Sequence, residues 1–398
     1  MQNSSAFAPQ KLLNKRYIFF CLINVAVSLS FSMVSTIMSK YVHSLGMTVA
    51  IAGSITGAFS IASMVVRPVS GYINDHMGKK RLLVLSNGFM GVCTLLYGLV
   101  QDPALLLVLR VFHGAAFSIS STVNMAVIPG IVPEKRMAEA ISYYGVIQSI
   151  AIAAGPSLGL ALVNVSGYPV NFAIAALLAG IGVALALSLD FINETPVCPK
   201  GRHKLRLTDI IARECLILAL IDIAIASVNG LENSLIALYG EKVGIGNIGW
   251  YFTISAITLM LTRLVLGRLS DRKGTAVAVY PGLALMIAGL LILWHAREPY
   301  QFALASVVKT TGVGMARPAI QAACLKAVPA SRRGAASSTY YLGSDIGQGT
   351  APAIGGKIVD VTGGDYGLTF ALYALPLAAS CVIYALSQAR SKRKSISL

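Results

Sequence analysis

The fold of this chain is decided by a short stretch at residues 67–81, which reads RPVSGYINDHMGKKR. The stretch closes one long apolar run and precedes the next. A related stretch, RLVLGRLSDRKG, occurs at residues 263–274. Arginine, glycine, aspartate and glycine take equivalent places in the two copies, always 196 residues apart. Because 196 residues is about half of the 398-residue chain, the sequence predicts a duplicated unit.

The composition indicates a lipid environment. Hydrophobic residues make up 56% of the chain and charged residues 12%, with a mean hydropathy of +0.71, whereas soluble domains carry about 25% charged residues. Twelve apolar runs approach the length that spans a bilayer. They cover roughly residues 17–39, 48–73, 82–100, 104–128, 138–164, 168–191, 211–238, 247–269, 275–295, 300–325, 335–359 and 367–388. The even number of runs predicts that both termini lie on one side of the membrane.

The repeat extends through both halves of this pattern. Pro133 and Pro329 are 196 residues apart. The sequence GPSLG at 155–159 corresponds to APAIG at 351–355 with the same offset. Each half holds six runs, so the two units have parallel topology and are expected to be related by an axis along the membrane normal.

Positive charge follows the loops. With the N-terminus inside, the inner segments hold 22 lysines and arginines and the outer loops hold three. This asymmetry predicts cytoplasmic termini in a cell membrane. It also explains the net charge of +16 as a topology signal, with anionic lipid as the partner of the cytoplasmic face and no nucleic-acid partner.

The opening stretch resembles the signature loop of the major facilitator superfamily, whose form is G-x-x-x-D-R-x-G-R-R. The matching residues are Gly71, Asp75, Gly78 and Lys79 in the first copy and Gly267, Asp271, Arg272 and Gly274 in the second. His76 stands where the family has its first arginine. The resemblance covers essentially the whole chain.

The resemblance implies an all-α membrane protein with twelve transmembrane helices in two pseudo-symmetric six-helix bundles. The expected domains are residues 1–192 and 211–398, joined by a cytoplasmic loop at 193–210. Helices 1, 4, 7 and 10 are expected to line a central site. The resemblance further implies a monomer that moves a small-molecule substrate, with no enzymatic activity, no cofactor and no metal site.

The duplicated loop is expected to act as a gate. By the same resemblance, Asp75 meets the start of helix 11 near residues 334–338, and pseudo-symmetry places Asp271 at the start of helix 5, near Met137. A carboxylate suits a helix N-terminus. The alternative is that these charges only anchor the loops at the cytoplasmic surface.

Arg110 lies six residues inside the fourth run, about 9 Å deep. It resembles the arginine of the family's helix 4 motif, which relatives use for proton coupling or for anionic substrate groups. A guanidinium inside a membrane needs a partner or a water-filled cavity. The alternative is that Arg110 reaches the outer headgroups.

The fifth run resembles, incompletely, the helix 5 motif of drug and proton antiporters. Its matching residues are Gly145, Gly155, Pro156 and Gly159. Ala151 and Leu160 replace two glycines of the family pattern. Because the eleventh run carries a similar glycine and proline pattern, close packing and hinge chemistry remain an alternative to antiport.

Ionisable residues inside a membrane are functional candidates. Asp222 and Asp345 fall near mid-membrane, and Lys309, Arg317 and Arg110 are the cations. Buried carboxylates suit proton binding, and the alternative is a structural pair with lysine or arginine connecting helices 7, 10 and 11. Glu232 lies nearer the outer end, where it can be solvated.

Polar residues complete the candidate site. Asn229 follows Asp222 on one face of the seventh run, and the first run offers Asn24, Ser28 and Ser35 on one face. The first run carries no acid, so protons would have to bind in the second half. The balance of charge favours an anionic or zwitterionic solute.

These features predict a secondary active transporter of a small organic solute that works by alternating access, preferably by proton-coupled efflux. A proton-coupled importer and a uniporter are the alternatives within this class. An intramembrane enzyme and a receptor built on a carrier fold are poorer interpretations.

Overall fold

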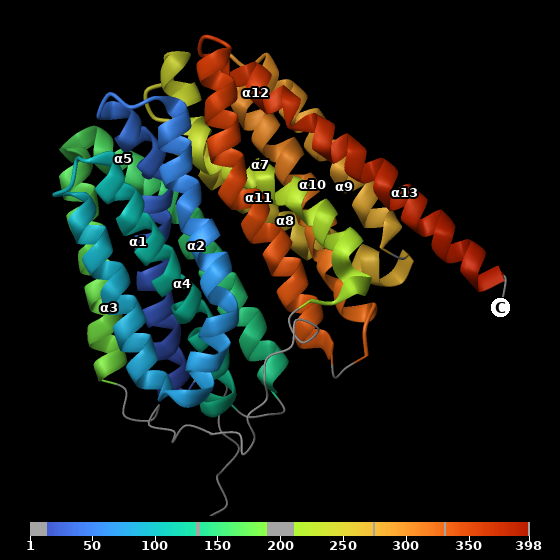
Figure 1. Cartoon of the computed structure of the whole chain (residues 1–398), viewed down its shortest axis with the longest axis horizontal. Helices are drawn as coiled ribbons and strands as arrows, with labels where there is room; N and C mark the ends of the chain where they lie inside the picture. The colour runs from blue at the N-terminus through green and yellow to red at the C-terminus, as the bar shows by residue number, and fades with distance from the viewer. Residues whose placement is uncertain (1–13, 133–135, 189–210, 274, 330–331, 397–398) are drawn as a thin grey trace, which may run out of the picture.

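The computed structural model describes residues 14–132, 136–188, 211–273, 275–329 and 332–396, which form helices and contain no strand. The first half contains α1 (Lys15–Ser44), α2 (Val49–His76), α3 (Lys79–Tyr97), α4 (Pro103–Ile131) and α5 (Met137–Leu187). The second half contains the short η3 (Arg213–Cys215), α7 (Leu216–Lys242), α8 (Gly249–Lys273), α9 (Ala276–Trp294), α10 (Pro299–Lys326), α11 (Arg333–Val361), α12 (Tyr366–Leu372) and α13 (Ala374–Ile396). Figure 1 shows the two halves side by side.

The helices follow the apolar runs. The run 138–164 and the described part of the run 168–191 fall on the single element α5, and the last run is divided between α12 and α13. Seven helical segments among the described residues are long and apolar enough to cross a membrane. The predicted all-α membrane fold is therefore confirmed. The count of twelve crossings and the domain bounds remain predictions, and the expected loop at 193–210 lies outside the described residues.

The long helix α5 reverses direction at Gly167. This residue has φ 81° and ψ 174°, inside an otherwise helical element, and Pro169 follows two residues later. Such dihedrals are essentially restricted to glycine. The chain therefore turns back on one residue where a loop joins the helices of most neighbouring pairs.

We expect Gly167→Ala to lower the free energy of unfolding by roughly 1–3 kcal/mol, because alanine pays for a strained backbone at this position. Thermal unfolding of the detergent-purified protein measures the change. Gly180→Ala is the matched control, since Gly180 is helical and a Cβ there meets nothing within 4 Å. Equal unfolding midpoints for the two variants would contradict the expectation.

The molecule has two faces at opposite ends of its helices. The terminal face carries the start of α1 and the end of α13. The distal face carries the α1–α2 connection and the α7–α8 connection, at the upper edge of Figure 1. The charge asymmetry of the loops predicts that the terminal face is cytoplasmic.

The two halves meet tightly near the distal face, where α2 packs on α11. A Cβ at Gly53 would lie 2.0 Å from the carbonyl oxygen of Pro352, and one at Gly57 would lie 1.9 Å from that of Gly349. No side chain fits into such spacings. The glycines of both helices therefore allow backbone to touch backbone, as small residues do between membrane helices.

A matching contact joins α5 to α8. Ser157 Oγ donates to the carbonyl oxygen of Gly249 at 2.6 Å and lies 2.6 Å from Thr253 Oγ1. Gly249 is 196 residues after Gly53, and Ser157 is 196 residues before Ala353, which also touches Gly53. The sequence repeat therefore extends to the contacts between the halves.

A carboxylate of one half caps a helix of the other. Asp360, at the distal end of α11, accepts hydrogen bonds from the backbone N–H groups of Val49 (3.1 Å) and Ala50 (2.9 Å) at the start of α2. The first N–H groups of a helix lack partners within the helix and favour negative charge. Ser39 and Ser234, 2.9 Å apart, add a contact between α1 and α7. The distal face is thus closed by three separate seams.

Candidate functional site

A cavity of about 760 Å³ separates the halves on the terminal side of these seams. Its lining comes from α1, α2, α4 and α5 of the first half and from α7, α8, α10 and α11 of the second. It reaches from Arg110, near the distal end of α4, to Gln321, near the terminal end of α10. This central cavity includes the four helices expected from the sequence and four more, because the helices that form the seams also face it.

Two ion pairs join α7 to α10. Lys309 Nζ lies 2.5 Å from Glu232 Oε2, and both side chains are nearly enclosed. The Tyr251 hydroxyl donates to the other carboxylate oxygen of Glu232. Arg317 Nε lies 3.3 Å from Oδ1 of the fully buried Asp222. The structural pairing considered as an alternative is therefore present for Asp222 with Arg317, whereas Lys309 pairs with Glu232 rather than with an aspartate.

Glu232 corrects one expectation. Its position toward the distal end of α7 suggested a solvated carboxylate, yet it is only 5% exposed. Burial is possible because Lys309 and Tyr251 supply one partner to each oxygen.

A third ion pair crosses between the halves. Arg67 of α2 donates from Nε to Asp345 Oδ2 of α11 at 2.9 Å, and Asp345 lines the central cavity. Pseudo-symmetry relates this contact to Arg263 of α8 and Ser149 of α5, 196 residues from Arg67 and Asp345 respectively. Arg263 reaches Ser149 Oγ at 3.5 Å. The two symmetric positions therefore pair arginine with a carboxylate in one case and with a hydroxyl in the other.

Arg110 is the least usual cation of the cavity. It is 1% exposed and donates to the carbonyl oxygens of Ile55 (3.4 Å) and Thr56 (3.2 Å). Its guanidinium lies 5.0 Å from the ring centroid of Phe59. Within the described residues, its terminal nitrogen NH1 has no hydrogen-bond partner. Arg110 lines the central cavity rather than reaching the headgroups, and no carboxylate among the described side chains is paired with it.

Six of the nine residues predicted for the site line the central cavity. They are Ser35, Arg110, Asn229, Lys309, Arg317 and Asp345. Asp222 lies behind Arg317. Asn24 and Ser28 are not among the lining residues, and Asn24 is buried against Phe20 and Tyr144.

Sequence reasoning missed several lining residues. Phe31, Phe59 and Phe117 form an aromatic cluster on the wall of the first half. Arg263, which lines the cavity, and Arg67, which pairs with the lining residue Asp345, marked the repeat but were not assigned to the site. The offset of 196 applied to Asp345 would have pointed to Ser149, but spacing alone does not show which helices face each other.

The glycines of the helix 5 motif pack against α1. A Cβ at Gly155 would lie 2.5 Å from Ser32 Cβ, and one at Gly159 would lie 2.8 Å from the carbonyl oxygen of Met33. Gly145 and Pro156 line the central cavity. Glycines of α11 pack on α7 and α2 in the same way. Close packing is therefore one role of this motif in both halves.

Most of the predicted gate lies outside the described part of the structure. This holds for the side chains of Asp75, Asp271 and Arg272, for Gly71 and Gly267, and for Gly274. Within the described part, Gly78 is the N-cap residue of α3 and Lys79 its first residue. The expected contacts of Asp75 and Asp271 remain predictions.

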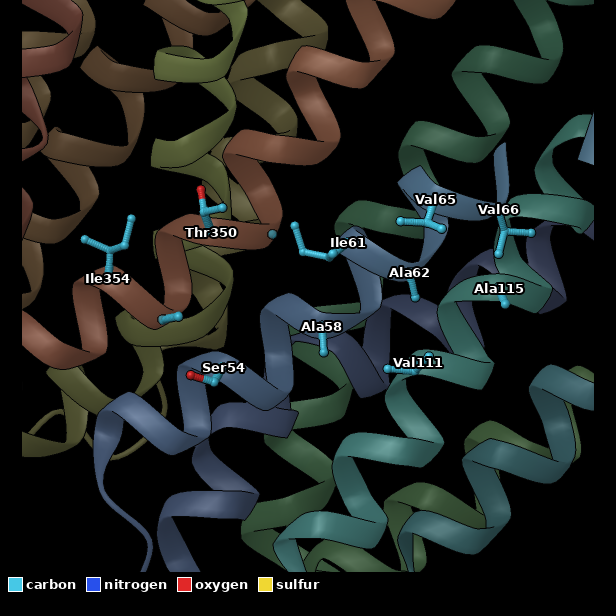
Figure 2. Close-up of a pocket in the computed structure, with 12 residues that line it drawn as sticks. Ser54, Ala58, Ile61, Ala62, Val65, Val66, Val111, Ala115, Thr350 and Ile354 are labelled. Carbon is cyan, nitrogen blue, oxygen red and sulfur yellow. The ribbon is translucent and has the colours of Figure 1, made fainter. Parts of the chain in front are cut away.

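A second cavity, of about 610 Å³, lies between α2, α4 and α11 and is drawn in Figure 2. Its lining is apolar apart from Ser54 and Thr350, and Val65 and Ile354 expose more than half of their surface. An apolar groove of this kind suits lipid chains. It holds no ionisable group, so the chemistry of the site belongs to the central cavity.

Comparisons of sequence agree with the duplication. The family model described as Major Facilitator Superfamily matches twice, at residues 20–227 and 215–397. The chain is 22% identical over 362 residues to an uncharacterized MFS-type transporter of Methanocaldococcus jannaschii, which covers 88% of this chain and 93% of that protein. It is 25% identical over 360 residues to the uncharacterized MFS-type transporter YhhS of Escherichia coli, and the match covers 88% of this chain and 87% of that protein.

Solved structures share the fold. The nucleoside transporter NupG matches with a TM-score of 0.77 at 12% identity, covering 93% of this chain and 99% of that chain. A POT family transporter in complex with 5-aminolevulinic acid matches with a TM-score of 0.79 at 13% identity, covering 94% and 96%. At these identities the likeness concerns the fold alone.

Proposed function

We propose that this chain, which belongs to the Major Facilitator Superfamily, is a proton-coupled secondary carrier that exports a small organic anion or zwitterion by alternating access. Membership in this family makes it a multi-pass membrane transporter of a small molecule rather than an enzyme. The preference for an acidic solute, the coupling to protons and the direction are our proposals.

The charge of the central cavity carries the proposal. Four cations line it: Arg110, Arg263, Lys309 and Arg317. Lys309 and Arg317 are paired with carboxylates, whereas Arg110 and Arg263 have no carboxylate partner among the described side chains. Arginine recognises carboxylate and phosphate groups through its planar set of donors. An acidic solute supplies the negative charge that these two guanidiniums lack.

Asp345 is our candidate for the proton-binding group. It is the cavity-lining acid, among those described, whose cation belongs to the other half of the molecule. Alternating access moves the halves relative to each other, so Asp345 can gain and lose Arg67 during the cycle. An unpaired carboxylate is costly inside a membrane and binds a proton instead. Glu232 keeps its partners within one half and is not exposed to this change.

The remaining parts of the proposal follow from the sequence. Export follows from the partial helix 5 resemblance at Gly145–Gly159. Cytoplasmic termini and a location in the cell membrane follow from the loop charges, as does an anionic lipid partner at the terminal face. A monomer follows from the family.

The test uses proteoliposomes that contain a pH-sensitive dye, with the voltage clamped by potassium and valinomycin. Small organic anions, zwitterions and cations are added outside at equal pH. Proton exchange makes the lumen more alkaline on addition of an acidic solute, symport makes it more acidic, and a uniporter leaves it unchanged. Movement of cations alone would contradict the proposed solute class.

Replacing Asp345 with asparagine is expected to reduce the solute-linked pH change at least tenfold, because the amide does not titrate. Counterflow of labelled solute, which needs no net proton movement, is expected to continue. Asp102→Asn is the matched control, because Asp102 is an exposed N-cap of α4 and asparagine caps helices equally well. Undiminished proton movement in Asp345→Asn would exclude Asp345 as the coupling group.

A further inference from the structure

The aromatic cluster beside Arg110 has no part in the proposal above. Phe31 stacks on Phe59 and on Phe117, with ring centroids 5.0 Å and 4.8 Å apart. Phe59 and Phe117 are 5.1 Å apart. The three rings come from α1, α2 and α4, and all three line the central cavity. Phe31 and Phe117 are only partly buried, so part of their ring surface is open to the cavity.

The cluster is held in place from behind. His113 of α4 meets the rings of Phe31 and Phe59 edge-on, at interplanar angles of 87° and 88°. Its Nδ1 lies 3.1 Å from the hydroxyl oxygen of the buried Tyr97. This support fixes the orientation of the aromatic wall before a ligand arrives, which lowers the cost of binding.

The cation lies at the edge of the same wall. The guanidinium of Arg110 is 5.0 Å from the centroid of Phe59, and its NH1 donor is buried without a partner among the described residues. An unmade bond to a buried charged donor is costly. A ligand that brings an acidic group here can satisfy NH1 once the guanidinium turns toward the cavity, and it places its body against the rings.

We infer that the central cavity takes an aromatic carboxylate, with its acid group on Arg110 and its ring against Phe31, Phe59 and Phe117. The inference rests on the proposed function and names the substrate class of that site. Aromatic rings gain from offset or edge-on contact beyond the burial of apolar area. The guanidinium gives the carboxylate a charge-assisted hydrogen bond.

Binding to the purified transporter in detergent tests the inference without transport. The probes are phenylacetate, its saturated counterpart cyclohexylacetate and its neutral counterpart phenylacetamide, with 1-naphthylacetate and 1-naphthylacetamide as a larger pair. We expect each aromatic acid to bind more than about 10-fold tighter than its amide. Phenylacetate is expected to bind about 2- to 10-fold tighter than cyclohexylacetate.

Variants at two positions, Phe117 and Arg110, test the aromatic contact and the acid contact separately. Phe117→Leu is expected to remove the preference for phenylacetate over cyclohexylacetate while keeping the preference for acid over amide. Arg110→Gln is expected to remove the preference for acid over amide, and its unfolding midpoint shows whether it remains folded. Arg110→Lys keeps the charge and loses the planar donors. Its preference for acid over amide is expected to lie between those of the parent and of Arg110→Gln.

The inference is overturned if no aromatic acid binds, if saturated and aromatic acids bind equally, or if Phe117→Leu leaves the aromatic preference unchanged. Failure of the proposed function looks different. If non-aromatic anions such as succinate move protons in the liposomes while aromatic acids neither bind nor move, the carrier proposal stands and the aromatic site does not. If no acid changes the luminal pH, the coupled-carrier proposal itself fails.

Discussion

Substituting Lys309 with methionine is expected to destabilise the folded protein by about 3–5 kcal/mol, because it leaves the buried Glu232 without its cation, whether the carboxylate stays charged or takes up a proton. Lys309 and Glu232 are 4% and 6% exposed at the side chain and 2.5 Å apart. Methionine preserves the unbranched start of the side chain, whose Cβ packs closely on Gly289. The loss therefore reports the missing ammonium group rather than a cavity.

A double-mutant cycle isolates the pair. Thermal and detergent-induced unfolding are measured for Lys309→Met, Glu232→Gln and the double variant. The double variant is expected to recover much of the lost stability, since replacing both charges removes the orphan as well as the pair. Tyr251 can still hydrogen-bond to the glutamine. A single Lys309→Met variant as stable as the parent would show that the carboxylate finds another partner.

Gly57→Ala is expected to lower the transport rate more than about tenfold by preventing closure of the distal face. A Cβ at Gly57 would lie 1.9 Å from the carbonyl oxygen of Gly349. The opposing atom is backbone and cannot rotate away, so α2 and α11 must separate. Closure at this face is one of the two end states of an alternating-access cycle, and a carrier that cannot reach it does not complete the cycle.

A cross-link reports closure independently of transport. Ser39 Oγ and Ser234 Oγ lie 2.9 Å apart at the distal seam of α1 and α7. Cysteines at both positions are expected to oxidise readily in the parent and slowly in Gly57→Ala. Gly180→Ala, which meets no neighbour within 4 Å, controls for the added methyl group. Parental cross-linking together with parental transport in Gly57→Ala would mean that α2 and α11 do not need this contact.

The pseudo-symmetric seam offers a graded comparison. A Cβ at Gly249 would lie 3.0 Å from Ser157 Cα, a less severe overlap than that at Gly57. Gly249→Ala is therefore expected to slow transport less than Gly57→Ala does, in the same assay. A larger effect from Gly249 would indicate that closure depends more on α5 and α8 than on α2 and α11.

The helices were predictable because membrane helices carry long apolar runs, and every run of the sequence falls on a helix. The turn at Gly167 was harder to predict from the sequence. Apolar spacing shows where one run ends, but not that the chain reverses on a single residue. The merged element α5 is therefore a feature that only backbone dihedrals reveal.

The sequence predicted which charged residues belong to the site, but not which of them form ion pairs. Arg110, Lys309, Arg317 and Asp345 were found because charge inside an apolar run is rare. The partner of Asp345 could not be found in this way, because Arg67 lies 278 residues away in sequence and belongs to the other half of the molecule. The phenylalanine cluster carried no sequence signal, because aromatic residues are common in any membrane helix.

The mismatch between Ser149 and Asp345 limits how much work the proposed cycle can do. In the proposed cycle Asp345 binds the proton, and the serine hydroxyl at the symmetric position cannot, so the two positions together carry one proton per turnover. With the membrane voltage held at zero, a one-to-one exchanger cannot build a solute concentration gradient steeper than the proton gradient that drives it, and each tenfold of either is worth about 1.4 kcal/mol. The duplication thus gave the carrier two related contacts between its halves but, in the proposed cycle, one proton-binding carboxylate. Ser149→Asp is the substitution that would add a second such carboxylate.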